Sequence, residues 1–353
     1  MQAGSAGRLL LVAAAFAPGG GIAFAQPVPD YDFQWSTIGA PGNPAYVNAQ
    51  PEAWLVDGRG SVGYEYRMSR LEVSTAQWME FLNSFNEVNV SSLPSTVQSF
   101  VFGSGLGWGA TTDTTDPTFP LRFKLHPLYE NAGMLPVRGI TWEQAAIYCN
   151  WLQNGKAVTV DAIRNGAYNA DTFVWNDQTN SQMHQLTRSP GARFWIPSLD
   201  EWIKAVHFDP EKAGPGLPGW WLHATSSDSA PIPGLPGVGQ TSAGVADAVA
   251  GTIPLGSYPN VQSPWGLWDT SGASAEWTEE AFEFPNPRYR LVFGSWGGIN
   301  TSDGRIFDAD AMFPAGADES GLRIASAIPA PGCLTIVAVV AFLNSTRRRN
   351  QEC

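Results

Sequence analysis

Three stretches of the chain place apolar residues at the three- and four-residue spacing of a helix face. Each begins with Ser or Thr followed three residues later by Gln or Glu, at Ser74, Thr141 and Ser198. In such a capping box the two side chains satisfy amides that are free at the start of a helix. The pattern therefore predicts three helices, whose apolar residues are Trp78, Phe81, Leu82 and Phe85, then Trp142, Ala145, Ala146, Cys149 and Leu152, then Trp202, Ile203 and Val206.

Other segments have the alternation or the β-branched and aromatic content of strands. Residues 31–47 begin like a strand and are broken by a turn, and residues 61–73, 288–297 and 321–326 are strand-like. Between these elements, residues 86–133 and 208–262 are rich in Gly and Pro, which cannot continue a helix. The pattern indicates an α+β domain with short elements and long loops.

The composition indicates a folded chain and argues against nucleic-acid binding. Hydrophobic residues make up 44% of the 353 residues, and charged residues only 15%, so the chain is globular and not disordered. The net charge of −12 argues against nucleic acid as a partner, because phosphate contacts need Lys and Arg. The chain has fifteen tryptophans, far above the usual number.

Both ends of the chain have features of processing signals. Residues 1–25 carry Arg8, an apolar run and a small-x-small site before Gln26, as a signal peptide does. Residues 328–353 carry a Pro-rich motif, the apolar run 333–343 and three arginines, and they resemble a PEP-CTERM sorting tail. The apolar run is shorter than the roughly 20 residues that span a bilayer.

These ends predict three parts of the chain: a signal peptide at 1–25, a domain at 26–327 and a sorting or anchor tail at 328–353. We therefore expect export to the cell envelope or the extracellular space, a membrane contact through the tail and a sorting protease as one partner. The alternatives are a buried N-terminal helix and a C-terminal core strand.

Six segments in order resemble the formylglycine-generating enzyme, or sulfatase-modifying factor, family. They are YRMSRLEVSTAQWMEFLN, LPVRGITWEQAAIYCNWL, FWIPSLDEWIKAV, GSYPNVQSPWGLWDTSGASAEWT, VFGSWGG and GLRIA. The resemblance covers about residues 60–326. It implies a single C-type-lectin-like α+β domain with few helices, short strands and long loops.

The acidic segment SPWGLWDTSGASAEWTEE, residues 263–280, is a candidate calcium loop. Asp269 and Glu276 offer carboxylates, and Gly272 and Ser274 offer carbonyl oxygens on a loop that can bend sharply. The family resemblance implies calcium at the same four positions. The alternative is a glycine turn between strands whose acids are solvated or capped.

The cysteines argue against the family's oxidase chemistry. The resemblance implies a copper(I) site made by two cysteines that follow the Gly294-Ser295-Trp296 motif, at about Gly298 and Asp303. Neither position is cysteine, and the chain has only Cys149, Cys333 and Cys353. Soft thiolates are what copper(I) requires, so copper is not expected here, and Cys149 is expected to be a buried core residue.

A second branch of the family holds iron through histidines spaced as H-x-x-x-E-x-H. The four histidines are scattered without that spacing, and we expect them at surface or loop positions: His126, His184, His207 and His223. No nucleophile elbow and no H-E-x-x-H motif is present in the sequence.

Two functions are consistent with these residues and motifs. The first is a non-catalytic ligand-binding or structural module, for which no catalytic residue is assigned and which binds a protein, peptide or carbohydrate. Its predicted ligand-binding residues are Ser295, Trp296, Asn300, Asp303, Asp308 and Asp310, with the loop tryptophans Trp108, Trp220 and Trp221 beside them. The second is a formylglycine-generating oxidase that converts a cysteine of a substrate protein to formylglycine.

Overall fold

The three predicted helices begin at the predicted capping boxes. They are α1 (Thr75–Ser84), α3 (Trp142–Gln153) and α5 (Leu199–His207). In each, the Ser or Thr side chain accepts from the amide three residues on, and the Gln or Glu side chain there accepts from the amide of the capping residue. The capping-box prediction is confirmed for all three helices.

The computed structural model describes residues 28–48, 53–85, 108–113, 115, 122–178, 181–283, 288–295, 304–314 and 320–329. The predicted signal peptide and nearly all of the predicted tail lie outside the described residues. Residues 29–328 form one compact unit, in which the helices are few and the strands short. None of the helices in these described segments is both long and apolar enough to cross a membrane.

The first sheet joins the two ends of this unit. Its strand order is β1 (Trp35–Ile38), β2 (Tyr66–Ser69), β14 (Ala325–Ser326) and β7 (Phe194–Trp195), and all its pairs are antiparallel. Ala325 pairs with Met68 on one side and with Trp195 on the other. The strand predicted over 61–73 is therefore confirmed only in its middle, because the following residues turn into α1.

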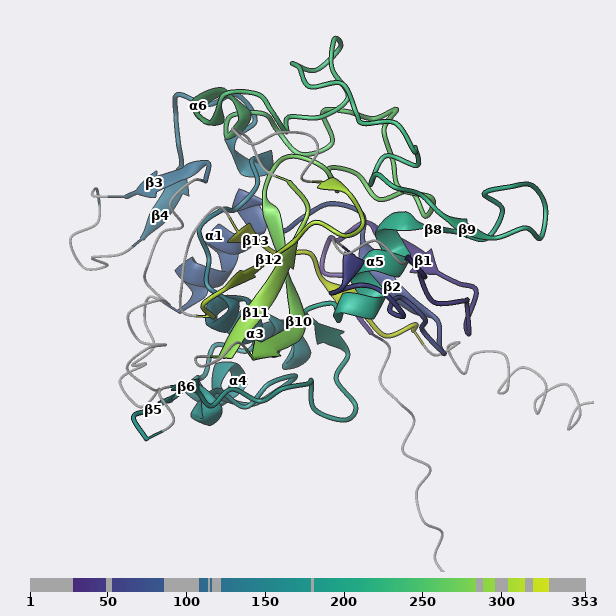
Figure 1. Cartoon of the computed structure of the whole chain (residues 1–353). Helices are drawn as coiled ribbons and strands as arrows, with labels where there is room; N and C mark the ends of the chain where they lie inside the picture. The colour runs from purple at the N-terminus through teal and green to yellow at the C-terminus, as the bar shows by residue number, and fades with distance from the viewer. Residues whose placement is uncertain are drawn as a thin grey trace, which may run out of the picture. The chain divides into compact units, whose positions relative to one another are not determined.

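The second sheet holds the acidic segment. Its strand order is β12 (Ala309–Met312), β11 (Arg288–Phe293), β10 (Ala275–Glu283) and β13 (Ser320–Gly321). The light green arrows of β10 and β11 run side by side near the centre of Figure 1. A register shift between Trp277 and Ala281 marks an irregularity in this pair.

The remaining described elements are short. They are the hairpins β3 (Ala110–Thr112) with β4 (Phe123–Leu125), β5 (Trp175–Asn176) with β6 (Ser181–Gln182) and β8 (Phe208–Asp209) with β9 (Gly219–Trp220), the helices α4 (Val160–Arg164) and α6 (Asp247–Ala250), and the 3-10 turns η2 (Ala132–Met134) and η3 (Ala170–Thr172).

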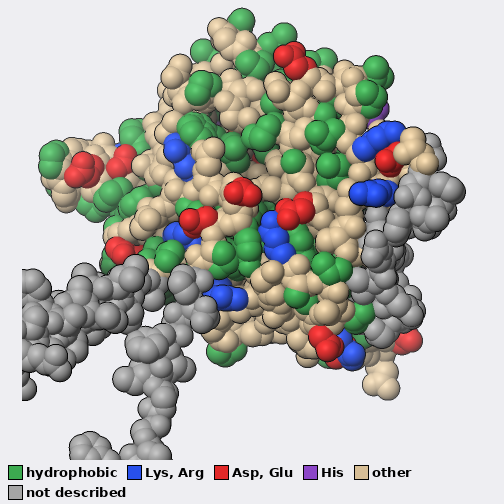
Figure 2. All heavy atoms as spheres, turned by 180° about the vertical axis from the view of Figure 1, so that it is seen from behind, with side chains coloured by type: hydrophobic (Ala, Val, Ile, Leu, Met, Phe, Trp, Pro, Cys, Tyr) green, Lys and Arg blue, Asp and Glu red, His purple; other side chains and the backbone are tan. Residues whose placement is uncertain are grey.

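Aromatic side chains of α1 and α3 form much of the core. Trp78, Phe81, Tyr148 and Trp151 are each at most 1% exposed, and their neighbouring ring centroids lie 5.2–5.7 Å apart. The face shown in Figure 2 carries acidic and basic side chains interspersed, without a large region of one sign. Recognition on that face would depend on local groups more than on a long-range field.

Candidate functional site

The predicted calcium loop is a tight turn that leads into β10. Gly272 has φ +97, and a Cβ there would lie 2.5 Å from Ser242 Oγ, so this position requires glycine. Asp269 and Ala273 both have φ 56, in the left-handed region. The turn delivers Ser274 and Glu276 into the interior, where both are 1% exposed.

Glu276 is bound by an arginine from the far end of the domain. Arg323 Nη2 lies 2.7 Å from Glu276 Oε1, its Nε lies 3.0 Å from each carboxylate oxygen, and Trp202 Nε1 donates to Oε2 at 2.7 Å. The remaining donors of Arg323 bind the carbonyl oxygens of Ser69 and Trp268 at 2.9 Å each. This fully buried ion pair ties β10 to the segment before β14.

Two further carboxyl groups lie around this pair. Glu72 accepts from the amide of Ser274 at 3.3 Å and from its hydroxyl at 2.6 Å. Asp269 accepts from the amide of Gly256 at 2.6 Å. Glu72 is 1% exposed and lies shortly after β2. We call Glu72, Asp269, Glu276 and Arg323 the acidic cluster.

The acidic cluster contains more negative than positive charge when all its groups are ionised. Burial, and after it the charge of Glu276, raises the pKa of Glu72 well above its usual range. Burial also raises the pKa of Asp269 to about 6, although the Gly256 amide and Arg323 lower it. One guanidinium cannot balance three carboxylates in a low-dielectric interior, so Glu72 is the group that stays protonated in the absence of another cation.

Glu72 is one of the residues that line a cavity of about 120 Å³. Its apolar walls are Phe33, Leu71 and Met134, and its other lining residues are Asp32, Gln34, Ser69, Ser74 and Gln77. Asp32 is exposed at this cavity and Phe33 is buried. Apolar walls with a few convergent polar groups and a carboxyl of shifted pKa are typical of a small-ligand site.

The predicted calcium ligands do not form a favourable donor set for calcium. Glu276 has its charge balanced by Arg323, and the Ser274 hydroxyl donates to Glu72. In the described segments no three His, Cys, Asp or Glu side chains are grouped to hold a metal ion. Calcium prefers six to eight oxygens, several of them carboxylate. Calcium at Asp269, Gly272, Ser274 and Glu276 therefore stays a prediction.

Three of the six predicted ligand-binding residues are described. Ser295 is fully buried, with its Oγ 3.3 Å from Ser271 Oγ, so a ligand cannot reach it in this conformation. Asp308 accepts from the Arg305 guanidinium at 2.9 and 3.0 Å, and Asp310 is exposed on β12. Trp296, Asn300 and Asp303 lie outside the described residues. The predicted face therefore stays a prediction centred on its two aspartates.

The loop tryptophans are more enclosed than the sequence suggested. Trp108 is 9% exposed and packs edge-on against Phe123, with ring centroids 5.0 Å apart. Trp220 packs at 5.1 Å against Phe208, and Trp221 donates its Nε1 to Asp209 at 3.0 Å. These rings stabilise the loops from which they come.

His184, His207 and His223 are buried. His184 and His223 lie between regular elements, as the loop prediction expected, whereas His207 belongs to α5. His207 lies in the last turn of α5 on its buried side, and burial lowers its pKa to about 3. His184 Nε2 lies 2.7 Å from Glu143 Oε1, and both side chains are inaccessible to solvent. Burial raises the pKa of Glu143 to about 8.

Cys149 is a core residue, as predicted. It lies on α3 with no exposed surface, and burial raises the pKa of its thiol well above the usual range. A thiol that stays protonated and enclosed is neither a nucleophile nor a metal ligand.

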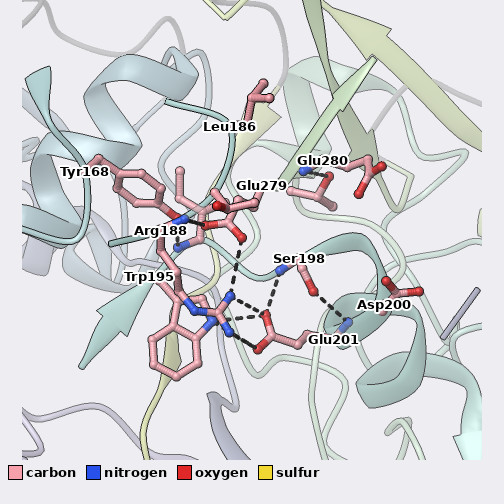
Figure 3. A network of polar contacts seen from close by, with 12 residues as sticks. Tyr168, Leu186, Arg188, Trp195, Ser198, Asp200, Glu201, Glu279 and Glu280 are labelled. Carbon is pink, nitrogen blue, oxygen red and sulfur yellow. Dashed lines mark hydrogen bonds and ion pairs between the residues drawn. The ribbon is translucent and has the colours of Figure 1, made fainter. Parts of the chain in front are cut away.

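A second polar cluster lies between α5 and β10 (Figure 3). Arg188 donates to Glu201 at 3.0 Å and to Glu279 at 3.3 Å, and its guanidinium lies 4.2 Å over the ring of Trp195. Tyr168 donates to Glu279 at 2.9 Å, and burial raises the pKa of Glu279 to about 7 although Arg188 lowers it. Because these groups bind one another, we interpret the cluster as structural.

Glu72 and Arg323, the two residues that complete the acidic cluster, were not among the predicted site residues. A signal was present for both, because each is a charged residue inside a strand-like run, SRLEV and GLRIAS. A charge that enters the core must be paired there. The partners could not be inferred, because 47 residues separate Arg323 from Glu276 and 202 residues separate Glu72 from Ser274.

The family model described as the sulfatase-modifying factor enzyme 1-like domain matches residues 53–328. No curated protein matches the chain.

Three solved structures are similar in fold. "Crystal Structure of CarF" is 18% identical with a TM-score of 0.50, over 84% of this chain and 99% of that one. PvdO from Pseudomonas aeruginosa is 12% identical with a TM-score of 0.42, over 86% of this chain and 100% of that one. Treponema denticola variable protein 1 is 13% identical with a TM-score of 0.41, over 84% and 95%. At these identities the likeness concerns the fold, and the two lower scores support no further argument.

Proposed function

Since the chain belongs to the sulfatase-modifying factor enzyme 1-like family, we propose that it is a non-catalytic member of that family, an exported module that binds a ligand. The binding site is the cavity lined in part by Glu72, and the group bound is a primary ammonium, carried by a peptide or an amino sugar. The observation that carries this proposal is that Glu72, a buried glutamate that belongs to a cluster with more negative than positive charge, also lines a cavity.

The distribution of cysteines supports a non-catalytic role. No cysteine lies between Cys149 and Cys333, so the segment after Gly294-Ser295-Trp296 has no thiol. The one cysteine of the predicted domain is enclosed in α3. A copper(I) site of the expected kind needs two accessible thiolates. The oxidase alternative would need a cofactor arrangement of another kind.

The charges around the cavity support an ammonium ligand. Glu72, Asp269 and Glu276 share the single guanidinium of Arg323. A second cation that enters next to Glu72 would let this carboxyl ionise and would be attracted strongly, because the site is screened from water. Phe33, Leu71 and Met134 provide walls for a short aliphatic stem. A cavity of this volume fits a head group and not a whole sugar or peptide.

The full chain is expected to leave a Cys-x-Pro-x-Arg peptide unchanged in the presence of copper(I) and oxygen, because it lacks the thiol pair. Mass spectrometry of the peptide, read for loss of the thiol and gain of an aldehyde, measures the reaction. A Cys333→Ser, Cys353→Ser variant is the control for copper captured by the two cysteines near the C-terminus. Aldehyde formation by that variant would overturn the non-catalytic proposal and leave the cavity proposal standing.

Nα-acetyl-lysine amide is expected to bind the full chain, and Nα-acetyl-norleucine amide, which has the same stem without the charge, is not. Glu72→Gln keeps the shape and the Ser274 contacts but removes the charge, so it is expected to weaken binding by about tenfold or more. Calorimetry or NMR titration measures both ligands. Binding is expected to strengthen as the pH rises, because the raised pKa of Glu72 must be passed before the carboxylate forms.

Glu211→Gln is the matched control for this titration, because Glu211 is an exposed acid outside the cavity. It removes the same charge and is expected to leave the affinity unchanged. Equal affinity of the two amides would show that binding does not depend on the ammonium group. Equal loss in the Glu72→Gln and Glu211→Gln variants would show that the binding reports only the net charge of −12.

Several finer features belong to the same proposal. Export through residues 1–25, retention at the envelope by residues 328–353 and removal of that tail by a sorting protease are supported by the sequence pattern. The C-type-lectin-like description is supported by the mixed α/β architecture with few helices and short strands. Structural calcium at the Asp269–Glu276 loop has the weakest support, and the proposed function does not depend on it.

A further inference from the structure

The loop at residues 231–239 exposes three aliphatic side chains within seven residues. Ile232 is 59% exposed, Leu235 is 53% exposed and Val238 is 84% exposed. No charged residue occurs from 229 to 246. Single exposed apolar residues are ordinary, but a contiguous group of them marks a contact surface. The segment belongs to the green loops in the upper part of Figure 1 that lead into α6.

Hydrogen bonds between backbone groups within the loop fix the conformation in which these side chains are exposed. The amides of Val238 and Gly239 donate to Leu235 O at 3.0 and 2.9 Å, and the amide of Gln240 donates to Ile232 O at 2.7 Å. A Cβ on Gly239 would lie 2.5 Å from the backbone of Gly234, so the two sides of the loop can only approach as glycines.

The loop is also fixed to the rest of the unit. Tyr258 Oη donates to Gly234 O at 2.8 Å, and the amide of Gly234 donates to Thr241 O at 3.1 Å. Three prolines in the loop limit its backbone freedom: Pro231, Pro233 and Pro236. The exposed side chains are therefore pre-organised, and little conformational entropy would be lost when they are buried.

We propose that loop 231–239 inserts into the interface of a lipid bilayer made of zwitterionic lipids. Its exposed side chains are aliphatic, whereas the central residues of protein interfaces are enriched in Trp, Tyr and Arg. Insertion into the acyl-chain region requires only apolar surface, which aliphatic side chains provide. The net charge of −12 excludes attraction to anionic headgroups as the driving force. The predicted membrane contact of residues 333–343 would place a bilayer within reach of the same chain.

The depth of insertion is limited by the backbone. Where the backbone amides and carbonyls of a loop are not bonded within the protein, they need water or headgroups as partners. The loop therefore lies at the boundary between headgroups and acyl chains and does not cross the hydrocarbon.

An environment-sensitive dye on residue 238 tests this contact in the full chain. The protein carries Val238→Cys with Cys333→Ser and Cys353→Ser, and Cys149 is buried and does not react. With phosphatidylcholine vesicles, the emission is expected to increase and shift to shorter wavelength. The matched control carries the dye at Leu217→Cys, between β8 and β9, where the leucine is 57% exposed, and no shift is expected there.

Adding Ile232→Ser and Leu235→Ser to the labelled protein is expected to raise the lipid concentration needed for the half-maximal shift by about tenfold or more. Both side chains are exposed, so the fold is retained. The proposal is overturned if vesicles sediment the protein without a shift at residue 238, which would mean that the tail alone binds. Equal shifts at 238 and 217, no vesicle binding at all, or an unchanged midpoint in the double serine variant would also overturn it.

Discussion

Replacing Arg323 by methionine is expected to destabilise the protein by about 3–5 kcal/mol, the cost of leaving a buried carboxylate without its partner. Arg323 is inaccessible to solvent, and it is bound to Glu276, to Ser69 O and to Trp268 O. Methionine fills most of the volume but supplies no donor. The free energy of unfolding from urea titration at neutral pH measures the loss.

The double variant Arg323→Met, Glu276→Gln separates charge from packing. It is expected to recover much of the loss, because no unpaired charge remains in the core, and it keeps the experiment decisive if the single variant does not fold. Arg164→Met is the control at an exposed pair with Asp171, and the melting temperature is expected to change little. A stable single variant, or a double variant no better than the single one, would contradict the role given to this ion pair.

The free energy of unfolding is expected to fall as the pH rises from about 5 to about 8, which is unusual for an acidic protein. Burial raises the pKa of three carboxyls from ordinary values of 3.8 or 4.5: to about 8 for Glu143, about 7 for Glu279 and about 6 for Asp269. The folded state thus holds protons that the unfolded state has released. This stability is complete below the ordinary carboxyl pKa and is lost as the pH rises through the folded values.

His207 acts in the opposite direction. Burial lowers its pKa from 6.5 to about 3. As the pH falls below 6.5, the histidine is therefore protonated in the unfolded state but stays neutral in the folded state. Stability is therefore also lost toward acid. The two effects together predict a maximum near pH 4, where the gain from the histidine and the loss from the carboxyls cancel.

The Glu143→Gln variant tests the alkaline side of this profile. Glu143 Oε2 has no hydrogen-bond partner in the described segments, and Oε1 lies 2.7 Å from His184 Nε2. A neutral glutamine amide is therefore expected to cost less free energy at this buried position than an ionised carboxylate. In this variant the free energy of unfolding is expected to fall less steeply with pH, by about 1.4 kcal/mol for each pH unit between about 5 and 7. Urea titrations across this range measure the slope.

Glu80→Gln is the matched control, because Glu80 is half-exposed and paired with Lys156 at the surface. Its slope is expected to equal that of the wild type. A wild-type profile that rises from about pH 5 to about pH 8, or a Glu143→Gln slope that equals the wild-type slope, would show that the Glu143 carboxyl is not held protonated in the fold.

The helices and the family could be predicted from the sequence because their determinants are local. A capping box lies within four residues, and the apolar face of a helix repeats within one or two turns, so Ser74, Thr141 and Ser198 marked the three helices correctly. The six ordered motifs indicated the family over about residues 60–326, and the family model matches residues 53–328. The buried state of Cys149 followed from its place on the α3 face.

The tertiary structure alone showed which residues the acidic segment binds. The sequence placed Asp269, Ser274 and Glu276 on one bending loop, and oxygens so close in sequence are consistent with a calcium site. Whether a carboxylate meets a metal ion or a guanidinium depends on which residue arrives from elsewhere. Here Arg323 comes from the segment before β14, and Glu72 comes from the segment after β2. The spacing of nearby residues in the sequence predicts neither the Arg323–Glu276 pair nor the Glu72–Ser274 contact.

Burial of the titratable groups was likewise decided by packing. Glu143 and His184 lie 41 residues apart and meet beside the ring of Trp142, and Ser295 is enclosed by a hydroxyl from residue 271. Sequence alone determined the helices, the family and the missing thiol pair, because each is a property of neighbouring residues or of composition. The tertiary structure decided which charges are paired and which glutamate lines a cavity, because desolvation depends on every element that packs around a group.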